Sequence, residues 1–136
     1  MMFLSCGFGE TSHTRLPSFK QIELQIETTL FTVGWAETPH EQALGLRYRN
    51  VGLNDGLLLP VNGGEVHMDG MQSPISAALL SSDGRIKQLW QLELDAPPKT
   101  IPDDGAYLLE MHDTWFVRHQ IKRDMRVLGI PNREQK

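Results

Sequence analysis

Three ionisable residues alternate with apolar ones in the segment Glu65-Val66-His67-Met68-Asp69. Residues two apart on a β-strand project from the same face, so a strand here would place both carboxylates beside the His67 imidazole. Such neighbours favour the protonated imidazole, and the group could transfer protons or form part of a metal site. The same alternation also predicts a simpler arrangement, in which Val66 and Met68 face the core and the polar residues face solvent. We expect the second arrangement and keep the first as its alternative.

A further candidate is Glu110, the charged residue within the apolar segment 106–111. Burying a carboxylate without a partner is costly, so we expect a cation nearby, and the candidate is Arg49. Such a pair could hold an anionic or hydroxylated ligand, or it could fix a helix to the sheet. We expect the structural role, because buried ion pairs often serve architecture.

The remaining reactive groups form no recognisable motif. His112, Asp113 and His119 could gather around a metal, but their spacing fits no single helix or strand face, and we expect Asp113 to cap a helix instead. The chain has no nucleophile elbow, zinc-protease motif, phosphate-binding glycine loop or Cys-x-x-Cys pair. We therefore predict no metal and no cofactor. Core packing is expected for the three tryptophans, Trp35, Trp90 and Trp115.

The composition is that of one globular domain. The chain has 136 residues, of which 40% are hydrophobic and 22% are charged, and a domain of this size buries roughly two thirds of its unfolded surface. The net charge of -4 argues against a nucleic-acid partner, which needs clustered Lys and Arg. No apolar run approaches the length of about 18 residues that would span a membrane.

The single cysteine, Cys6, excludes an internal disulfide and follows a short apolar run. The ending Ser5-Cys6-Gly7 is similar to the end of a bacterial lipoprotein signal, although the basic region and longer apolar core are missing. Two hypotheses stay open. The protein is cytoplasmic with an incidental thiol, or it is an extracytoplasmic lipoprotein anchored through Cys6 whose true start lies upstream.

One helix and several short strands must position these candidates. Thr38 and Glu41 can form a capping box with Pro39 at the first helical position, which predicts a helix from Thr38 towards Arg49 unless Gly45 ends it early. Alternating or continuous apolar patterns predict the strands. These lie at 21–27, 31–35, 57–59, 65–69, 75–80, 85–94, 106–111 and 125–130.

The absence of a strand-helix-strand rhythm favours a mainly β fold. We predict a single-domain antiparallel β-sandwich or barrel with one short α-helix near residues 38–49. A flexible leader is expected at 1–19, the β domain at 20–130 and a tail at 131–136. The proline-rich segment 95–105 is expected to be a loop without strand pairing.

Several residues also match a known family pattern in its order and spacing. The matching positions include Ala36, Thr38, Gly45, Leu46, Tyr48, Arg49, Gly56, Leu57, Leu58, Leu59, Met68, Pro74, Ile75, Gly84, Ile86, Leu109, Glu110, Ile121, Asp124 and Val127. In these positions the chain resembles domain of unknown function family 192 over about Lys20 to Ile130. The resemblance implies a jelly-roll-like β-sandwich crossed by one helix, and no established activity.

The chain departs from that family pattern mainly at polar positions. The departures are Arg47 for Met, His67 for Trp, Asp69 for Lys, Gly70 for Asn, Ser76 for Asp and Arg123 for Gly. If the family's Lys and Asp form a site, this chain has lost or rebuilt it.

These observations lead to one function hypothesis and two alternatives. The first is a non-catalytic binding module for a small polar ligand or a protein partner, with Arg49, His67, Asp69 and Glu110 as candidate ligand-binding residues. The first alternative is an enzyme doing acid/base chemistry, with His67 as the base and Asp69 or Glu65 orienting it. The second alternative is a structural protein with a degenerate family site.

Overall fold

The computed structural model describes residues 18–131, so Cys6 lies outside the described part of the chain. Within this range the chain forms nine strands and two short helices. In chain order they are β1 (Lys20–Ile26), β2 (Thr29–Trp35), α1 (Pro39–Leu44), β3 (Gly56–Pro60), β4 (Glu65–Val66), β5 (Ile75–Leu80), β6 (Ile86–Leu92), β7 (Lys99–Thr100), β8 (Tyr107–His112), α2 (Trp115–Arg118) and β9 (Val127–Leu128).

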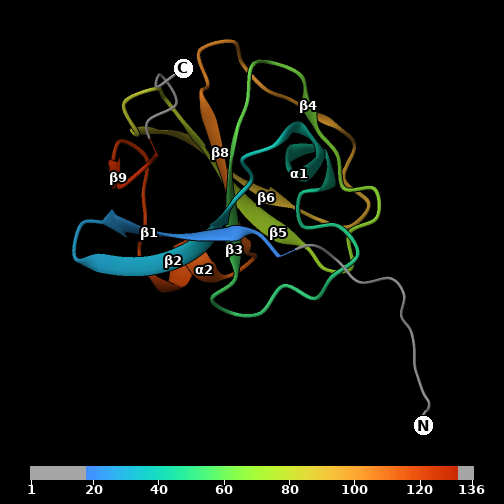
Figure 1. Cartoon of the computed structure of the whole chain (residues 1–136), viewed down its shortest axis with the longest axis horizontal. Helices are drawn as coiled ribbons and strands as arrows, with labels where there is room; N and C mark the ends of the chain where they lie inside the picture. The colour runs from blue at the N-terminus through green and yellow to red at the C-terminus, as the bar shows by residue number, and fades with distance from the viewer. Residues whose placement is uncertain (1–17, 132–136) are drawn as a thin grey trace, which may run out of the picture.

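Seven of the strands form one sheet that curls into a half-barrel, in the order β6-β5-β8-β3-β2-β1-β9 (Figure 1). Its neighbouring strands are antiparallel, except that β2 and β3 run parallel. The two ends of the sheet approach each other at a single bridge between Arg85 and Arg126. Strands β4 and β7 form a separate antiparallel pair. The expected mainly β fold is confirmed, with one parallel pair that the sequence pattern did not indicate.

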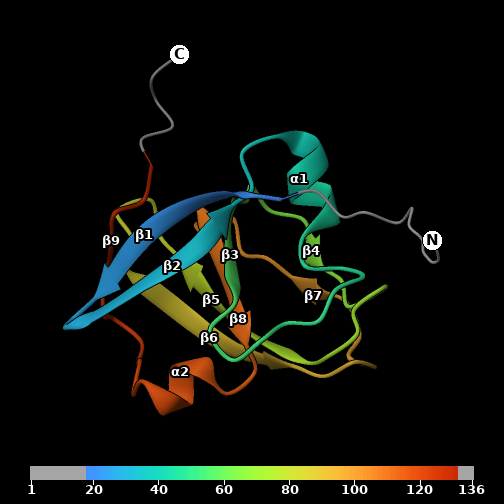
Figure 2. The same ribbon diagram turned by 60° about the horizontal axis from the view of Figure 1, so that its bottom comes forward.

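The curled sheet has a hydrophobic core on each face, and each core is covered by a different helix (Figure 2). On one face, α2 buries Trp115 and Phe116 against the strands, and we call this the α2 face. On the opposite face, which we call the α1 face, Leu46 and the partly buried Leu44 pack over the sheet. The site described below lies on the α1 face.

Helix α1 begins as the sequence predicts and ends earlier. The Glu41 amide donates to Thr38 Oγ1 over 3.1 Å, and the Thr38 amide donates to Glu41 Oε1 over 3.0 Å, so the capping box is formed. The Glu41 carboxylate accepts from the Thr38 amide and also from the Glu37 amide over 2.9 Å, and these bonds, that of Thr38 first, hold the pKa of Glu41 below its ordinary value. The helix stops at Gly45, whose φ of 56° and ψ of -138° suit glycine. The helix does not continue to Arg49.

Strand β6 contains an irregularity that changes which side chains share a face. Leu80 pairs with Ile86 whereas Leu79 pairs with Gln88, so Lys87 is an extra residue in the ladder. Ile86 therefore packs into the core of the α2 face, and Leu92 packs into the core of the α1 face. A regular strand would place both side chains on one face, but one inserted residue reverses the side-chain direction between them.

Two further short elements differ from expectation. The segment 95–105 contains β7, which pairs with β4 through Val66 and Lys99, so it is not wholly a loop. Helix α2 has Thr114 at its N-cap, with no side-chain capping bond. The expected capping role of Asp113 is therefore wrong. The additional helix α2 also means that α1 is not the single helix of the domain.

Candidate functional site

Glu110 occupies the middle of β8 on the α1 face of the sheet. Its backbone pairs with Leu57 on β3 and with Ala77 on β5, so strands flank it on both sides. Side chains alternate along β8, and Leu109 and Met111 point into the core of the α2 face. Glu110 points the opposite way and is only 8% exposed. The sheet thus holds a carboxyl group beneath the end of α1.

A cavity of about 330 Å³ lies above Glu110, between the sheet and the end of α1. We call it the α1 cavity. Its walls are mainly aliphatic, formed by Leu44, Leu46, Leu59, Val61, Val66 and Ile75 among others. Gly45 belongs to its roof, and a Cβ placed there would lie 3.9 Å from Glu110 Oε1. The volume falls in the range of about 300–1,000 Å³ that is typical of small-molecule sites.

The carboxyl group of Glu110 has no hydrogen bond or ion pair to any of the residues 18–131. Burial removes it from water and raises its pKa from the ordinary 4.5 to about 7. The positive charge of Arg47, which also lines the cavity, acts in the opposite direction and limits the rise. Both the neutral and the ionised forms are therefore populated near neutral pH.

Glu65 and His67 lie at the edge of the α1 cavity. Glu65 Oε1 is 3.5 Å from His67 Nε2, and these side chains are 50% and 41% exposed. Val66 and Met68 are buried, at 7% and 6% exposure. The expected solvent-facing arrangement is confirmed, although β4 itself ends at Val66. Asp69 is exposed in the following turn and does not line the α1 cavity.

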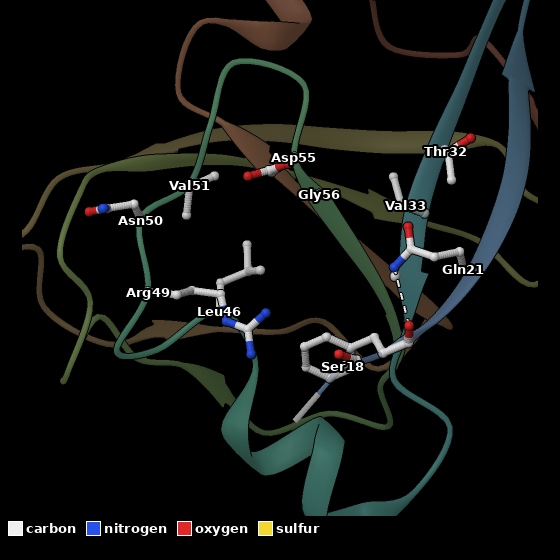
Figure 3. A pocket seen from close by; sticks show the side chains of 12 residues that line it. Ser18, Gln21, Thr32, Val33, Leu46, Arg49, Asn50, Val51, Asp55 and Gly56 are labelled. Atoms are coloured by element: carbon white, nitrogen blue, oxygen red, sulfur yellow. Dashed lines mark hydrogen bonds between the residues drawn. The ribbon is translucent and has the colours of Figure 1, made fainter. Parts of the chain in front are cut away.

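Arg49 lies in a different cavity, of about 390 Å³, which we call the Arg49 cavity. Figure 3 shows Arg49 reaching inward from its loop, with Leu46 beside it. The Arg49 guanidinium carbon is 5.0 Å from the centre of the Phe19 ring, a distance at which a cation–π contact forms. The expected pairing of Arg49 with Glu110 is therefore wrong, because the arginine that acts on Glu110 is Arg47.

The structure brings together two of the four candidate ligand-binding residues. Glu110 and His67 line the α1 cavity, Arg49 lines the Arg49 cavity, and Asp69 lines neither. Sequence reasoning missed Arg47 as a member of the site. The sequence did contain a signal for Arg47. A long cation replaces an apolar Met of the family pattern directly after Leu46, which is buried in the structure.

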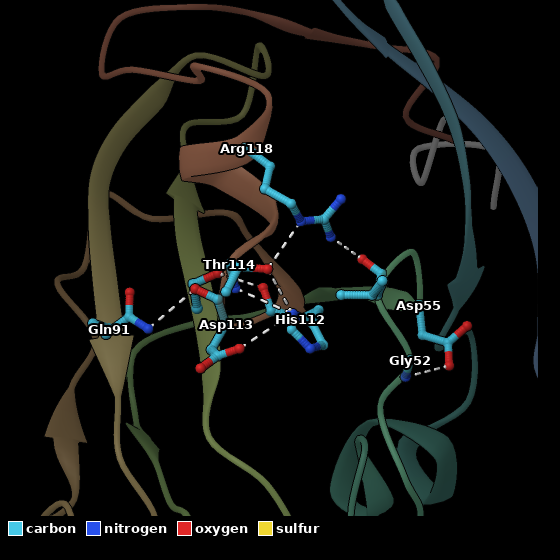
Figure 4. Close-up of polar contacts among 9 residues, drawn as sticks. Gly52, Asp55, Gln91, His112, Asp113, Thr114 and Arg118 are labelled. Carbon is cyan, nitrogen blue, oxygen red and sulfur yellow. Dashed lines mark hydrogen bonds and ion pairs between the residues drawn. The ribbon is translucent and has the colours of Figure 1, made fainter.

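A separate polar group surrounds His112 at the end of β8 (Figure 4). The Thr114 amide donates to His112 Nδ1 over 3.2 Å, and Thr114 Oγ1 lies 3.0 Å from the same nitrogen. Asp113 Oδ1 is 3.1 Å from it. Arg118 Nε donates to Thr114 Oγ1 over 2.9 Å, and its terminal nitrogen donates to the Leu53 carbonyl. We call these four side chains, those of residues 112–114 and 118, the His112 network.

The His112 network does not resemble a metal centre. The His119 ring packs against Trp115, with ring centres 4.5 Å apart and the ring planes inclined by 41°. Within residues 18–131, no three His, Cys, Asp or Glu side chains are grouped in a way that could hold a metal ion. Trp35 and Trp115 are core residues, and Trp90 is half-buried with the Lys99 ammonium 5.4 Å from its ring centre.

None of the helices in residues 18–131 has the length and apolar character needed to cross a membrane. No curated protein gives a significant match to the chain. Similar solved structures do exist. A "putative transcription regulator" from Sinorhizobium meliloti 1021 aligns with a TM-score of 0.76 and 20% identity, covering 85% of this chain and 98% of that one.

A second similar structure is a protein of unknown function from Novosphingobium aromaticivorans DSM 12444. It aligns with a TM-score of 0.70 and 20% identity, covering 88% of this chain and 99% of that one. At this level of identity both likenesses concern the fold alone. The family model DUF192, described as Uncharacterized ACR, matches residues 22–129, and the chain therefore belongs to this family.

Proposed function

We propose that this protein is a small-ligand binding module and that its ligand occupies the α1 cavity. The observation that carries the proposal is Glu110, a carboxyl group that is 8% exposed and has no partner among residues 18–131. A buried polar group without a hydrogen bond destabilises a protein by roughly 1–3 kcal/mol, and more if it is charged. A ligand that bonds to the carboxyl group would offset this cost.

The surroundings of Glu110 support a small ligand over a protein partner. The group lies at the base of a concave, mostly aliphatic cavity, whereas a protein interface is usually a broad and flatter patch. Arg47, Glu65 and His67 add polar groups at its edge, which could orient a ligand. We therefore assign Glu110 as the anchoring residue and His67 as an edge residue. Arg49 and Asp69 are outside the proposed site.

The proposal can be tested by screening small polar compounds for an increase in melting temperature, because a ligand that binds only the folded state stabilises it. Compounds that bind in the α1 cavity should stabilise the natural protein and lose most of this effect in Glu110→Gln. Glu23→Gln is the matched control, because Glu23 is an exposed carboxylate on β1. The proposal is wrong if every stabilising compound acts equally on Glu110→Gln and on the control.

The second candidate function is an enzyme that transfers protons in the same cavity. The observation that favours it is the presence of two ionisable side chains, Glu110 and His67, on one cavity, with Glu65 3.5 Å from the imidazole. A carboxyl group with a pKa of about 7 suits proton transfer at neutral pH. Of the two residues proposed to orient His67, Glu65 lies beside it, whereas no hydrogen bond or ion pair joins Asp69 to it in the described part of the chain.

A nitrobenzisoxazole probe can test this second candidate, because a base that removes its ring proton opens the ring and releases a coloured phenolate. If Glu110 acts as the base, the rate should exceed that of acetate at equal concentration by at least about a hundredfold. The rate should also fall in Glu110→Gln and persist in Glu23→Gln. Equal rates in the two variants would exclude Glu110 as a base for this probe.

A further inference from the structure

Resting on the proposed ligand-binding function, we propose that the α1 cavity selects an organic cation. The ligand would carry a primary ammonium group, which bonds to Glu110, and an aliphatic tail, which lies along the cavity wall. Two features support this class of ligand independently of each other. They are the balance of charge around the cavity and the distribution of its apolar surface.

The charge balance of the α1 cavity favours a cation over an anion. Its ionisable lining residues are Arg47, Glu65, His67 and Glu110. They come from the loop after α1, from β4 with the residue that follows it, and from β8. Two carboxylates, those of Glu110 and Glu65, therefore face the one guanidinium of Arg47, and the His67 imidazole lies 3.5 Å from Glu65 at the edge. An added ammonium group would balance this excess, whereas an added carboxylate would enlarge it.

Arg47 leaves the carboxyl group open to a second cation. Its charge acts on Glu110, but it forms no hydrogen bond or ion pair with it in the described part of the chain. An ammonium group has three donors and a carboxylate has about four acceptor positions, so a direct charge-assisted bond can form. Such a bond is roughly twice as strong as one between neutral groups.

The apolar lining of the α1 cavity indicates what the rest of the ligand is. Beyond the four ionisable residues and Gln42, the side chains that line it are aliphatic or Met71, which is partly buried. Removing aliphatic surface from water is favourable and desolvating a polar group is not, so a hydrocarbon tail would bind there and a second polar end would not. A linear monoamine fits this distribution better than a diamine or an amino acid.

Binding of such a cation must be linked to a proton. Below a pH of about 7 the Glu110 carboxyl group is mostly protonated, so the ammonium ion has to displace that proton to form the charged pair. The affinity should fall by up to about tenfold for each unit of pH below this value. A neutral alcohol of the same length displaces no proton, so its affinity should change little.

Pentylamine, pentanol and pentanoate provide a matched test by calorimetric titration of the full chain. Near pH 8, pentylamine should bind at least about tenfold more tightly than pentanol, and pentanoate should bind most weakly. At lower pH, pentylamine binding should release a proton. This release appears as a dependence of the binding enthalpy on the ionisation enthalpy of the buffer.

Variants can show whether Glu110 is the source of the released proton and of the preference for the amine. In Glu110→Gln, pentylamine should lose at least about tenfold in affinity and its pH dependence, while pentanol should bind as before. Glu23→Gln should behave like the natural protein. His67→Gln should retain the pH dependence, and a loss of that dependence in this variant would overturn the assignment to Glu110.

The outcomes separate this inference from the proposed function on which it rests. If pentanol or pentanoate binds in a Glu110-dependent manner at least as tightly as pentylamine, the cavity binds ligands but does not select cations. If none of the three compounds binds and none of the screened compounds depends on Glu110, the ligand-binding function itself is wrong. Preferential, proton-linked binding of pentylamine that requires Glu110 supports both.

Discussion

Glu110 and His112 are two residues apart on β8, and strand geometry gives them the same face of the sheet. Their surroundings nevertheless differ. His112 Nδ1 lies within 3.2 Å of the Thr114 amide, of Thr114 Oγ1 and of an Asp113 carboxylate oxygen. Glu110 has no such partner among residues 18–131 and lies below a cavity. Of these two polar side chains on one strand, one has several hydrogen-bonding partners and the other has none in the described part of the chain.

This difference indicates that the His112 network has a structural role and that Glu110 belongs to a candidate binding site. The His112 network connects β8 to α2 and reaches the Leu53 carbonyl through Arg118, so its hydrogen bonds fix the chain where the strand ends. The Glu110 side chain makes no hydrogen bond or ion pair that joins β8 to another of the described elements. Removing its charge should therefore raise the free energy of unfolding. A polar group that lowers the stability of the free protein while facing a cavity is the better candidate for binding.

The largest expected effect is a dependence of stability on pH that comes from Glu110. The folded protein retains this proton up to a pH of about 7, whereas the unfolded chain releases it near 4.5. The stabilisation is therefore fully present below pH 4.5 and is lost as the pH rises through about 7. At one pKa unit per 1.36 kcal/mol, the contribution of this group to the free energy of unfolding falls by about 3 kcal/mol over that range.

Glu110→Gln should lack this fall and should be more stable than the natural protein at about pH 8, as measured by urea unfolding. A neutral amide resembles the protonated carboxyl group, so the two proteins should differ little at about pH 4. Glu23→Gln should follow the natural curve. Parallel curves for the natural protein and Glu110→Gln would mean that the Glu110 carboxyl group is not desolvated.

A somewhat smaller effect is expected at Gly45, which forms the roof over Glu110. Its φ of 56° and ψ of -138° are accessible to glycine and strained for other residues. Gly45→Ala should therefore destabilise the fold by about 2 kcal/mol at any pH, through backbone strain. The added Cβ would meet Glu110 at an ordinary 3.9 Å, so no clash contributes.

Thermal unfolding of Gly45→Ala and of the double variant with Glu110→Gln tests this reason. Strain at Gly45 is independent of the carboxyl group, so the loss should be the same in both backgrounds. A loss that disappears with Glu110→Gln would mean that crowding of the carboxyl group, and not the backbone, sets the cost. The roof would then be part of the reason why Glu110 has no partner.

The sequence revealed the strands better than it revealed the site. Alternation over Gln21 to Ile26 and the continuous apolar segment Ile75 to Leu80 predict β1 and β5, because side-chain period and burial follow directly from residue type. The extra residue at Lys87 and the parallel β2–β3 pair were not visible in this pattern. Both depend on backbone register, which residue type does not encode locally.

The site was predicted in part for a similar reason. Glu110 stood out because a charge interrupts an apolar segment, and that signal belongs to one residue. Which arginine lies near Glu110 depends on the path of the chain in the folded protein. After the turn at Gly45, Arg47 lines the α1 cavity and Arg49 lies over Phe19. Sequence spacing alone could not distinguish these two arginines. The sequence also left open whether the helix ends at Gly45 or continues through both of them.

Within the His112 network, the effect of one side chain should be modest and opposite in sign to that of Glu110. Thr114→Val removes the hydroxyl group that lies between Arg118 Nε and His112 Nδ1, and it should destabilise the protein by about 1 kcal/mol. Urea unfolding at about pH 7 measures the change. Val117→Thr is the control, since Val117 is 78% exposed on the same helix and should tolerate a hydroxyl group.

An unchanged stability in Thr114→Val would mean that the hydroxyl group makes no net contribution in solution. The contrast between Glu110 and the His112 network would then rest on Glu110 alone. A stabilisation by Thr114→Val would mean that the network, like Glu110, contains a polar group that lowers the stability of the free protein. Its polar groups would become candidates for binding, and the Thr114 hydroxyl would be the first to examine.

The smallest expected effect distinguishes the two arginines through the ionisation of Glu110. Arg47 lowers the Glu110 pKa against the larger effect of burial, so Arg47→Gln should raise that pKa further, by less than about one unit. Arg49→Gln should leave it unchanged, because Arg49 lies over Phe19 in the other cavity. An NMR titration of the Glu110 side-chain carboxyl carbon measures both. If Arg49→Gln gives the larger rise, Arg49 is the cation that acts on the α1 cavity, and the charge balance that favours an ammonium ligand has to be recalculated with it.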